Sequence, residues 1–210
     1  MHEHAQPPAP PSLAAREPPQ QEPREAAPVE GEPLLCVAYR RPGHDDQDDP
    51  VFDLIWAMMS GGMLQDELVR GRRIAMAASA RPGIPGTRFE HLLVFFIAPT
   101  LASTLEENEQ ALYEIIAGLQ SAPPGERTLQ RAKAALRADL LRRMARNDSL
   151  ASLLAAARAS YGDWRKLLTS FDDVNRVSAA DVQRVAARYL TAERRTTGYV
   201  RRPERPGARQ

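Results

Sequence analysis

Apolar residues recur along this chain with two periods, which separate predicted strands from predicted helices. Short apolar runs bounded by turn residues are typical of strands, and they lie at residues 34–39, 74–80 and 89–98. Residues 194–200, which contain Thr and Tyr, predict a final strand. Apolar residues three and four positions apart indicate helices. The predicted helices, in chain order, occupy residues 49–60, 64–70, 103–122, 128–161 with a break at Asn147, 162–171 and 178–190.

Polar residues at the ends of these segments predict where several helices begin. Ser178 and Asp181 have the spacing of a capping box, in which a hydroxyl and an acid each accept a backbone N–H. Ser103 and Glu106 have the same spacing and predict a second capping box. Asp49, followed by a proline, predicts the start of the first helix, and the Gly61–Gly62 pair predicts its end.

The order strand, helix, two strands, several helices, strand is typical of the α+β class. We predict an antiparallel sheet with helices packed on one face. The uniformly apolar run Leu92–Ile97 predicts a central strand that is covered on both faces.

The proline distribution divides the chain into a folded domain and two tails. Residues 1–31 hold eight of the 18 prolines and predict a disordered linker, because such a segment buries too little apolar surface to offset its ordering entropy. Residues 22–29 are a weak strand candidate whose prolines, Pro23 and Pro28, argue against a central position. The domain is predicted at 32–202, and a second disordered tail at 203–210.

The composition excludes several classes of function but does not identify one. The chain has 210 residues, with 28 basic and 27 acidic side chains, and this balance gives no drive toward nucleic acid or membranes. No apolar run reaches the roughly 18 residues of a membrane span. The arginines of 128–161 are interpreted as a solvated helix face. A single cysteine, Cys36, excludes an internal disulfide and a cysteine-based zinc site.

Several segments, taken in order, resemble the pitrilysin/insulinase (M16) zinc metallopeptidases. The strongest is the closing run V-S-A-A-D-V-Q-R-V-A-A-R-Y-L at 177–190. The others are Gly61–Val69, Arg72–Ser79, Leu129–Lys133 and Gly162–Arg165. The resemblance extends from about residue 17 to residue 200 and implies the LuxS/MPP-like fold of one M16 half-unit.

The zinc motif of that family is absent. M16 enzymes carry H-x-x-E-H on a helix, with two histidine ligands and a glutamate base. Here Thr87 stands at the first histidine position before Glu90-His91, and the pattern places that pair at the start of a strand. We therefore predict no catalytic residue and no metal ligand in this chain, and the resemblance implies zinc in a partner half. An unusual metal site around His91 is the least favoured alternative.

In M16 enzymes two half-units face each other around a chamber, and the half without zinc helps to bind peptide. Its characteristic Tyr and Arg fall at Met76 and Val69 here, with Arg70 one place out of register. An extended peptide can add to a sheet edge as a further strand. The predicted peptide contacts are Arg70, Ile74, Met76 and Ala78, with residues 74–80 as the edge.

The leading hypothesis is a non-catalytic M16 half that pairs with an H-x-x-E-H half and holds unfolded peptide. Such a chain would not catalyse proteolysis alone but would support a zinc metalloendopeptidase when paired. The alternative is a structural or assembly protein that keeps the fold without peptide processing. The sequence leaves open a homodimer and, for a bacterial protein, a periplasmic or cytoplasmic location.

Overall fold

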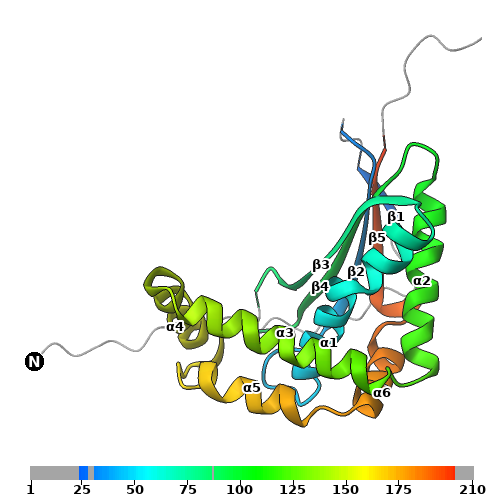
Figure 1. The fold of residues 1–210 in the computed structure, drawn as a ribbon. Helices are drawn as coiled ribbons and strands as arrows, with labels where there is room; N and C mark the ends of the chain where they lie inside the picture. The colour runs from blue at the N-terminus through cyan, green and yellow to red at the C-terminus, as the bar shows by residue number, and fades with distance from the viewer. Residues whose placement is uncertain (1–23, 28–30, 87, 202–210) are drawn as a thin grey trace, which may run out of the picture.

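The computed structural model describes residues 24–27, 31–86 and 88–201 and contains one five-stranded sheet (Figure 1). The strands are β1 Arg24–Ala27, β2 Leu34–Arg41, β3 Ala75–Ile84, β4 His91–Pro99 and β5 Arg195–Val200. Their spatial order is β1-β5-β2-β4-β3, so β3 forms one edge of the sheet. Strands β2 to β5 pair antiparallel, whereas β1 pairs parallel with β5.

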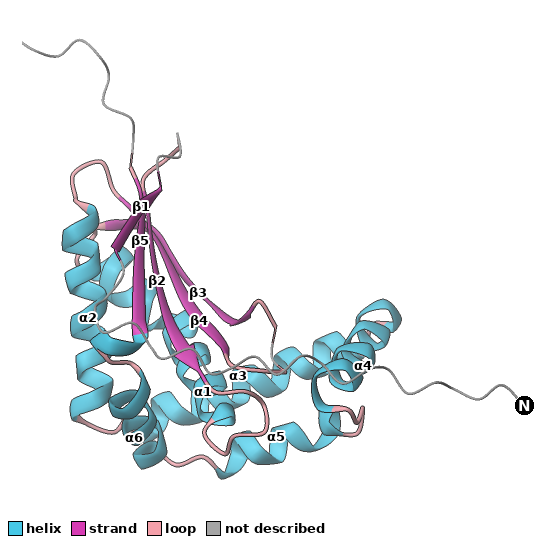
Figure 2. Ribbon diagram, turned by 180° about the vertical axis from the view of Figure 1, so that it is seen from behind, coloured by secondary structure: helices cyan, strands magenta, loops and turns pink. Residues whose placement is uncertain are grey.

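Helices cover one face of this sheet, as the two opposite views show (Figures 1 and 2). They are α1 Asp49–Met58, α2 Leu105–Ser121, α3 Glu126–Met144, α4 Asn147–Tyr161, α5 Lys166–Arg176 and α6 Ala179–Tyr189. Two π-helical segments, η1 Met59–Met63 and η2 Gln65–Gly71, link α1 to β3, and a 3₁₀ turn, η3 Ala192–Arg194, precedes β5. Helix α2 runs alongside the sheet, while α3, α4 and α5 extend away from its lower end. The predicted α+β class is confirmed.

The core lies between the sheet and the helices. In β2 the alternating residues Leu35, Val37 and Tyr39 are fully buried, as expected for a strand with one covered face. Phe52 of α1 and Leu112 of α2 are equally buried on the helical side. Removal of such apolar area from water is the main force that holds a layer of helices on a sheet. No helix in the described part of the chain is long and apolar enough to cross a bilayer.

One predicted helix start is confirmed and another is wrong by one residue. Ser178 and Asp181 form the predicted capping box at α6. At α2 the box is formed by Thr104 and Glu107 instead of the predicted Ser103 and Glu106. The Ser103 hydroxyl donates to the carbonyl of Ile74, so it is occupied before α2 begins.

The start of α1 differs from the prediction, whereas the helix stop predicted at Gly61–Gly62 is confirmed. The N-cap is Asp48, one residue earlier than predicted, and its side chain makes no capping hydrogen bond. After α1 the chain continues into η1 and is interrupted at Gly62, whose φ is 159° and whose backbone is not helical, before the next helical segment, η2. A glycine tolerates this backbone angle because it has no Cβ.

The weak strand candidate at residues 22–29 is confirmed by β1, which occupies an edge of the sheet, as its flanking prolines favour, and lies inside the segment 1–31 predicted to be a linker. The prediction for β4 needs correction. Strand β4 is an interior strand whose second face is covered only in part, since Val94 is buried there and its neighbours on that face are not. Leu93 and Phe95 are fully buried against the helices, whereas Leu92 and Phe96 are only half-buried on the other face.

Candidate functional site

The four residues predicted to contact peptide lie at and beside the edge strand β3. Met76 is 59% exposed, and Arg70 in η2 is exposed and paired with Asp66. Ile74, immediately before β3, is partly buried, and Ala78 is 6% exposed. The structure therefore leaves only Met76 and Arg70 of these four with side chains available to a partner.

Met76 protrudes because the edge strand is irregular at that point. Ala75 lies opposite Pro99, and Ala77 lies opposite Ala98, so Met76 is an extra residue between two regular pairs. An extra residue of this kind is a β-bulge, which bends the strand and turns a side chain out of the regular alternation. The bulge explains why a large apolar side chain is exposed here.

The outer edge of β3 is already occupied by hydrogen bonds from the preceding helical segment. Trp56 donates its indole N–H to the carbonyl of Ala80 at 3.0 Å, and Gln65 donates its amide N–H to the carbonyl of Ala78 at 2.8 Å. Carbonyls two residues apart in an antiparallel ladder point to the same side. Because α1 and η2 lie outside the sheet, these donors cover acceptors that an added strand would need. Proteins commonly protect edge strands in this way.

Ile74 holds the fold together through its backbone. Its carbonyl accepts the backbone N–H of Thr100 at 2.9 Å, the side-chain amide of Asn108 at 3.1 Å and the hydroxyl of Ser103. This single acceptor ties the start of β3 to the loop and helix that follow β4. Ile74 was predicted to contact peptide, but its carbonyl already accepts these internal hydrogen bonds.

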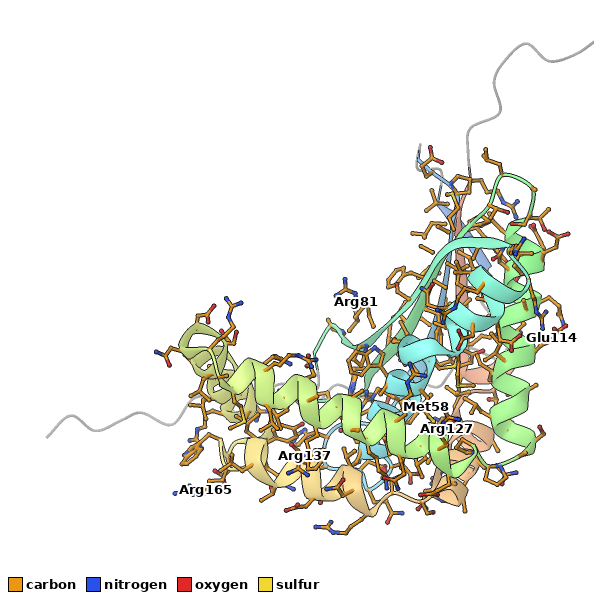
Figure 3. The ribbon with its side chains drawn as sticks, in the orientation of Figure 1. Met58, Arg81, Glu114, Arg127, Arg137 and Arg165 are labelled. Carbon is orange, nitrogen blue, oxygen red and sulfur yellow. The ribbon has the colours of Figure 1, made fainter. Side chains whose placement is uncertain are left out.

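The sheet face opposite the helices is open and largely apolar. Cys36, Ala38 and Phe96 are half-buried on it. Burial raises the pKa of the Cys36 thiol, so the thiol stays protonated at neutral pH. Arg81 of β3 is exposed and stands apart from the helical layer (Figure 3). This face has the apolar character of a contact surface without any cluster of reactive side chains.

His91 lies in a buried charged cluster that the sequence did not reveal. Arg41 of β2 donates to the Asp49 carboxylate, to the Asp49 carbonyl at 3.0 Å and to the Asp53 carboxylate at 3.1 Å. His91 Nδ1 lies 2.8 Å from the carbonyl of Phe89, and its Nε2 lies 3.9 Å from Asp49 Oδ1. In the sequence, this cluster could have been recognised from Arg41, a charged residue at a core-facing position of β2.

The positive charge of Arg41 opposes the binding of a cation at this cluster. Burial lowers the pKa of His91, and the nearby Arg41 guanidinium lowers it further, so the imidazole is neutral at neutral pH. Arg41 also donates to Oδ1 of Asp49, the carboxylate oxygen that lies nearest His91. Among the described residues there is no group of three or more side chains that could hold a metal ion. Thr87, at the missing histidine position, lies outside the described residues.

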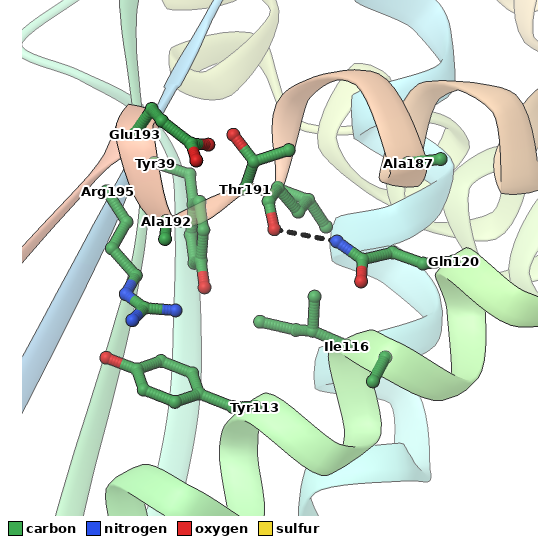
Figure 4. Close-up of a pocket in the computed structure, with 11 residues that line it drawn as sticks. Tyr39, Tyr113, Ile116, Gln120, Ala187, Thr191, Ala192, Glu193 and Arg195 are labelled. Atoms are coloured by element: carbon green, nitrogen blue, oxygen red, sulfur yellow. Dashed lines mark hydrogen bonds between the residues drawn. The ribbon is translucent and has the colours of Figure 1, made fainter.

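A cavity of about 520 Å³ lies between α2 and the segment that leads into β5 (Figure 4). The guanidinium carbon of Arg195 lies 3.7 Å from the ring centre of Tyr113, and Gln120 donates to the carbonyl of Leu190 at 2.9 Å. Glu193 also lines the cavity. These contacts join side chains of the cavity wall to each other or to the backbone. They therefore connect α2 with the end of α6.

Comparison with known proteins finds similarity in structure and none in sequence. No family model matches the chain, and no curated protein matches it. A protease from Helicobacter pylori superposes with a TM-score of 0.76 at 19% identity, over 87% of this chain and 45% of the other. The inactive peptidase domain of a Bordetella parapertussis protein gives 0.71 at 24% identity, over 85% and 97%.

A third structure, the peptidase M16 inactive domain from Pseudomonas fluorescens, gives a TM-score of 0.72 at 15% identity, over 87% of this chain and 44% of the other. The chain thus spans less than half of the Helicobacter and Pseudomonas chains and nearly all of the Bordetella domain.

Proposed function

Because this chain has the fold of the inactive domains of M16 peptidases, we propose that it is the non-catalytic half of an M16-type zinc metallopeptidase. It pairs with a half that carries H-x-x-E-H and zinc, and it forms one wall of a chamber that holds an unfolded peptide. The observation that carries this proposal is the similarity of the described fold to a complete inactive peptidase domain.

The site geometry supports a role without catalysis by this chain. His91 is buried and held beside Arg41, and the described residues include no cluster of metal ligands. The sheet face opposite the helices carries half-buried apolar side chains such as Cys36 and Phe96, which suits contact with extended chains that expose apolar side chains. Zinc and the water-activating base belong to the partner half in this proposal.

Peptide contact is proposed at β3, through Met76 and Arg70 together with the edge beside Ala78. The side chain of Gln65 would have to release the Ala78 carbonyl before a peptide strand could pair there. Ala78→Pro removes the backbone N–H at this position. Loss of peptide binding by a folded Ala78→Pro variant would support strand addition, and unchanged binding would count against it.

The first test is an affinity pull-down of the full chain from its source cells, with mass spectrometry of the retained proteins. Recovery of a protein with H-x-x-E-H, followed by cleavage of an unfolded peptide only when both chains are present, is the expected result. Failure to recover such a partner, together with a monomer or self-dimer in sedimentation, would overturn the pairing.

A structural or assembly protein is the second candidate. It is favoured by Met76 and Val69, which stand where the resemblance places Tyr and Arg, and by the occupied carbonyls along β3. In that case the chain would form a stable complex with its partner without changing the rate of peptide cleavage. A cleavage assay with and without this chain separates the two functions.

A further inference from the structure

A second cavity, of about 230 Å³, lies between the end of α1 and the start of α3. Its apolar walls include Met58 and Met63, and its polar wall is formed by Arg127, Thr128 and Arg131 of α3. Met58 and Arg127 line it from the two facing helices (Figure 3). A cavity of this size accommodates one large side chain or the end of a peptide.

The two arginines at this cavity have no acidic partner among the described residues. Other exposed arginines do have one, as Arg72 has Glu114 and Arg201 has Glu106. Arg127 and Arg131 make no ion pair or hydrogen bond with any described residue. They are four positions apart on one helix, where like charges repel.

The position of Arg127 adds to this imbalance. It lies in the first turn of α3, where the free backbone N–H groups make the helix end positive and favour an anion. The carboxylate of Asp66, which also lines the cavity, is already paired with Arg70. The cavity therefore offers two cationic side chains at the start of α3, where Glu126 contributes one negative charge, and one acid, Asp66, that is paired with Arg70.

The cavity adjoins the edge strand through a single short segment. Asp66 follows Gln65, which donates to the carbonyl of Ala78 in β3. The residue that contacts β3 and the residue that lines the cavity are therefore neighbours in η2. Gly61 lines the cavity as well, and a Cβ at this position would meet no atom within 4 Å.

We propose that this cavity is a subsite for a carboxylate of the bound peptide, held by Arg127 and Arg131 with the methionines beneath it. The carboxylate is that of an acidic side chain or of the peptide's C-terminus. This inference rests on the proposed function and adds a specificity to it. Arginine pairs with carboxylates through two parallel hydrogen bonds, which gives both affinity and geometric selectivity.

The test measures binding of four unstructured peptides to the full chain by fluorescence anisotropy. The peptides share one apolar sequence and combine an internal Asp or Asn with a C-terminal carboxylate or amide. Wild-type chain is expected to prefer one carboxylate-bearing form roughly ten-fold, as for one charge-assisted hydrogen-bonded pair. The matrix shows which of the two carboxylates is recognised.

Two matched pairs of variants locate the effect. Arg127→Gln with Arg131→Gln is expected to abolish the preference, whereas Arg137→Gln with Arg143→Gln removes the same charge from the same helix and should retain it. Gly61→Leu fills the cavity and should abolish the preference, whereas Gly61→Ala should not. Thermal unfolding followed by circular dichroism confirms that each variant is folded.

The outcomes separate this inference from the proposed function. Peptides that bind the wild type with equal affinity overturn the subsite and leave the peptide-holding role intact. A preference that is lost equally in both arginine pairs reflects general charge and also overturns the subsite. Absence of binding by all four peptides, with or without an H-x-x-E-H partner, overturns both proposals.

Discussion

The starts of α1 and α3 place arginines in opposite electrostatic settings. At α1, Arg41 reaches from the sheet to the carboxylates of Asp49 and Asp53 and is only 2% exposed. At α3, Arg127 and Arg131 are exposed, line a cavity and have no described partner. A buried charge without a partner is too costly to persist, so pairing is a requirement of the fold. An exposed unpaired arginine is free to bind something else.

The comparison therefore separates a structural cluster from a binding candidate, although both contain arginine near a helix start. The resemblance to a metallopeptidase family draws attention to His91, which belongs to the structural cluster. The binding candidate lies elsewhere, on a helix that the sequence suggests is only a solvated basic surface.

The largest effect is expected from Arg41→Ala. This change leaves the buried carboxylate of Asp49 without its counter-charge and should lower the free energy of unfolding by about 3–5 kcal/mol. Urea denaturation followed by circular dichroism measures it. Arg40→Ala, one residue earlier and directed to the other sheet face, should change stability by less than about 0.5 kcal/mol. Equal losses for the two variants would show that the cluster has no special role.

A smaller effect is expected from pH through His91. Its folded-state pKa is lowered by burial, so the unfolded chain binds a proton more readily than the folded chain. Stability should therefore fall as the pH drops below the unfolded histidine pKa of about 6.5 and continue to fall until the lower folded pKa is passed. Denaturation midpoints between neutral and mildly acidic pH measure this, and His91→Gln should flatten that part of the profile. A wild-type profile identical to that of the variant would contradict the assignment.

Gln65→Ala is expected to lower stability moderately and to test peptide binding at the edge strand β3. Loss of its hydrogen bond to the Ala78 carbonyl should cost about 0.5–1.5 kcal/mol of stability. The same change uncovers an acceptor on β3, so peptide affinity should rise if peptides pair with this edge. Gln110→Ala, on the exposed face of α2, is the control for both measurements. Unchanged peptide affinity in Gln65→Ala would count against β3 as a peptide edge.

The smallest effect on stability is expected from Arg127→Gln with Arg131→Gln. Removal of two like charges from the start of α3 should leave stability unchanged or raise it by about 0.3–0.5 kcal/mol. Thermal unfolding at low salt is the suitable measurement. A clear loss of stability would place these arginines with Arg41 as structural residues and would weaken the case for a carboxylate subsite.

Predictions from the sequence succeeded where a feature depends on residues close together in the chain. The capping box of α6 involves two residues three positions apart, and it was predicted correctly. The box of α2 was misplaced because Ser103 donates to Ile74, 29 positions earlier, which no local pattern reveals. The bulge at Met76 was also missed, since it depends on how β3 pairs with its neighbour β4.

The sequence by itself determined the class of fold, because periodicity and turn residues specify strands and helices locally and the order of elements limits how they can pack. Tertiary structure alone decided what those elements do for each other. It placed Trp56 and Gln65 on the carbonyls of β3, closed Arg41 over the carboxylates of α1, and aligned Arg127 and Arg131 with a cavity. These contacts join segments distant in sequence, and their energies depend on burial and geometry that exist only after the chain has packed.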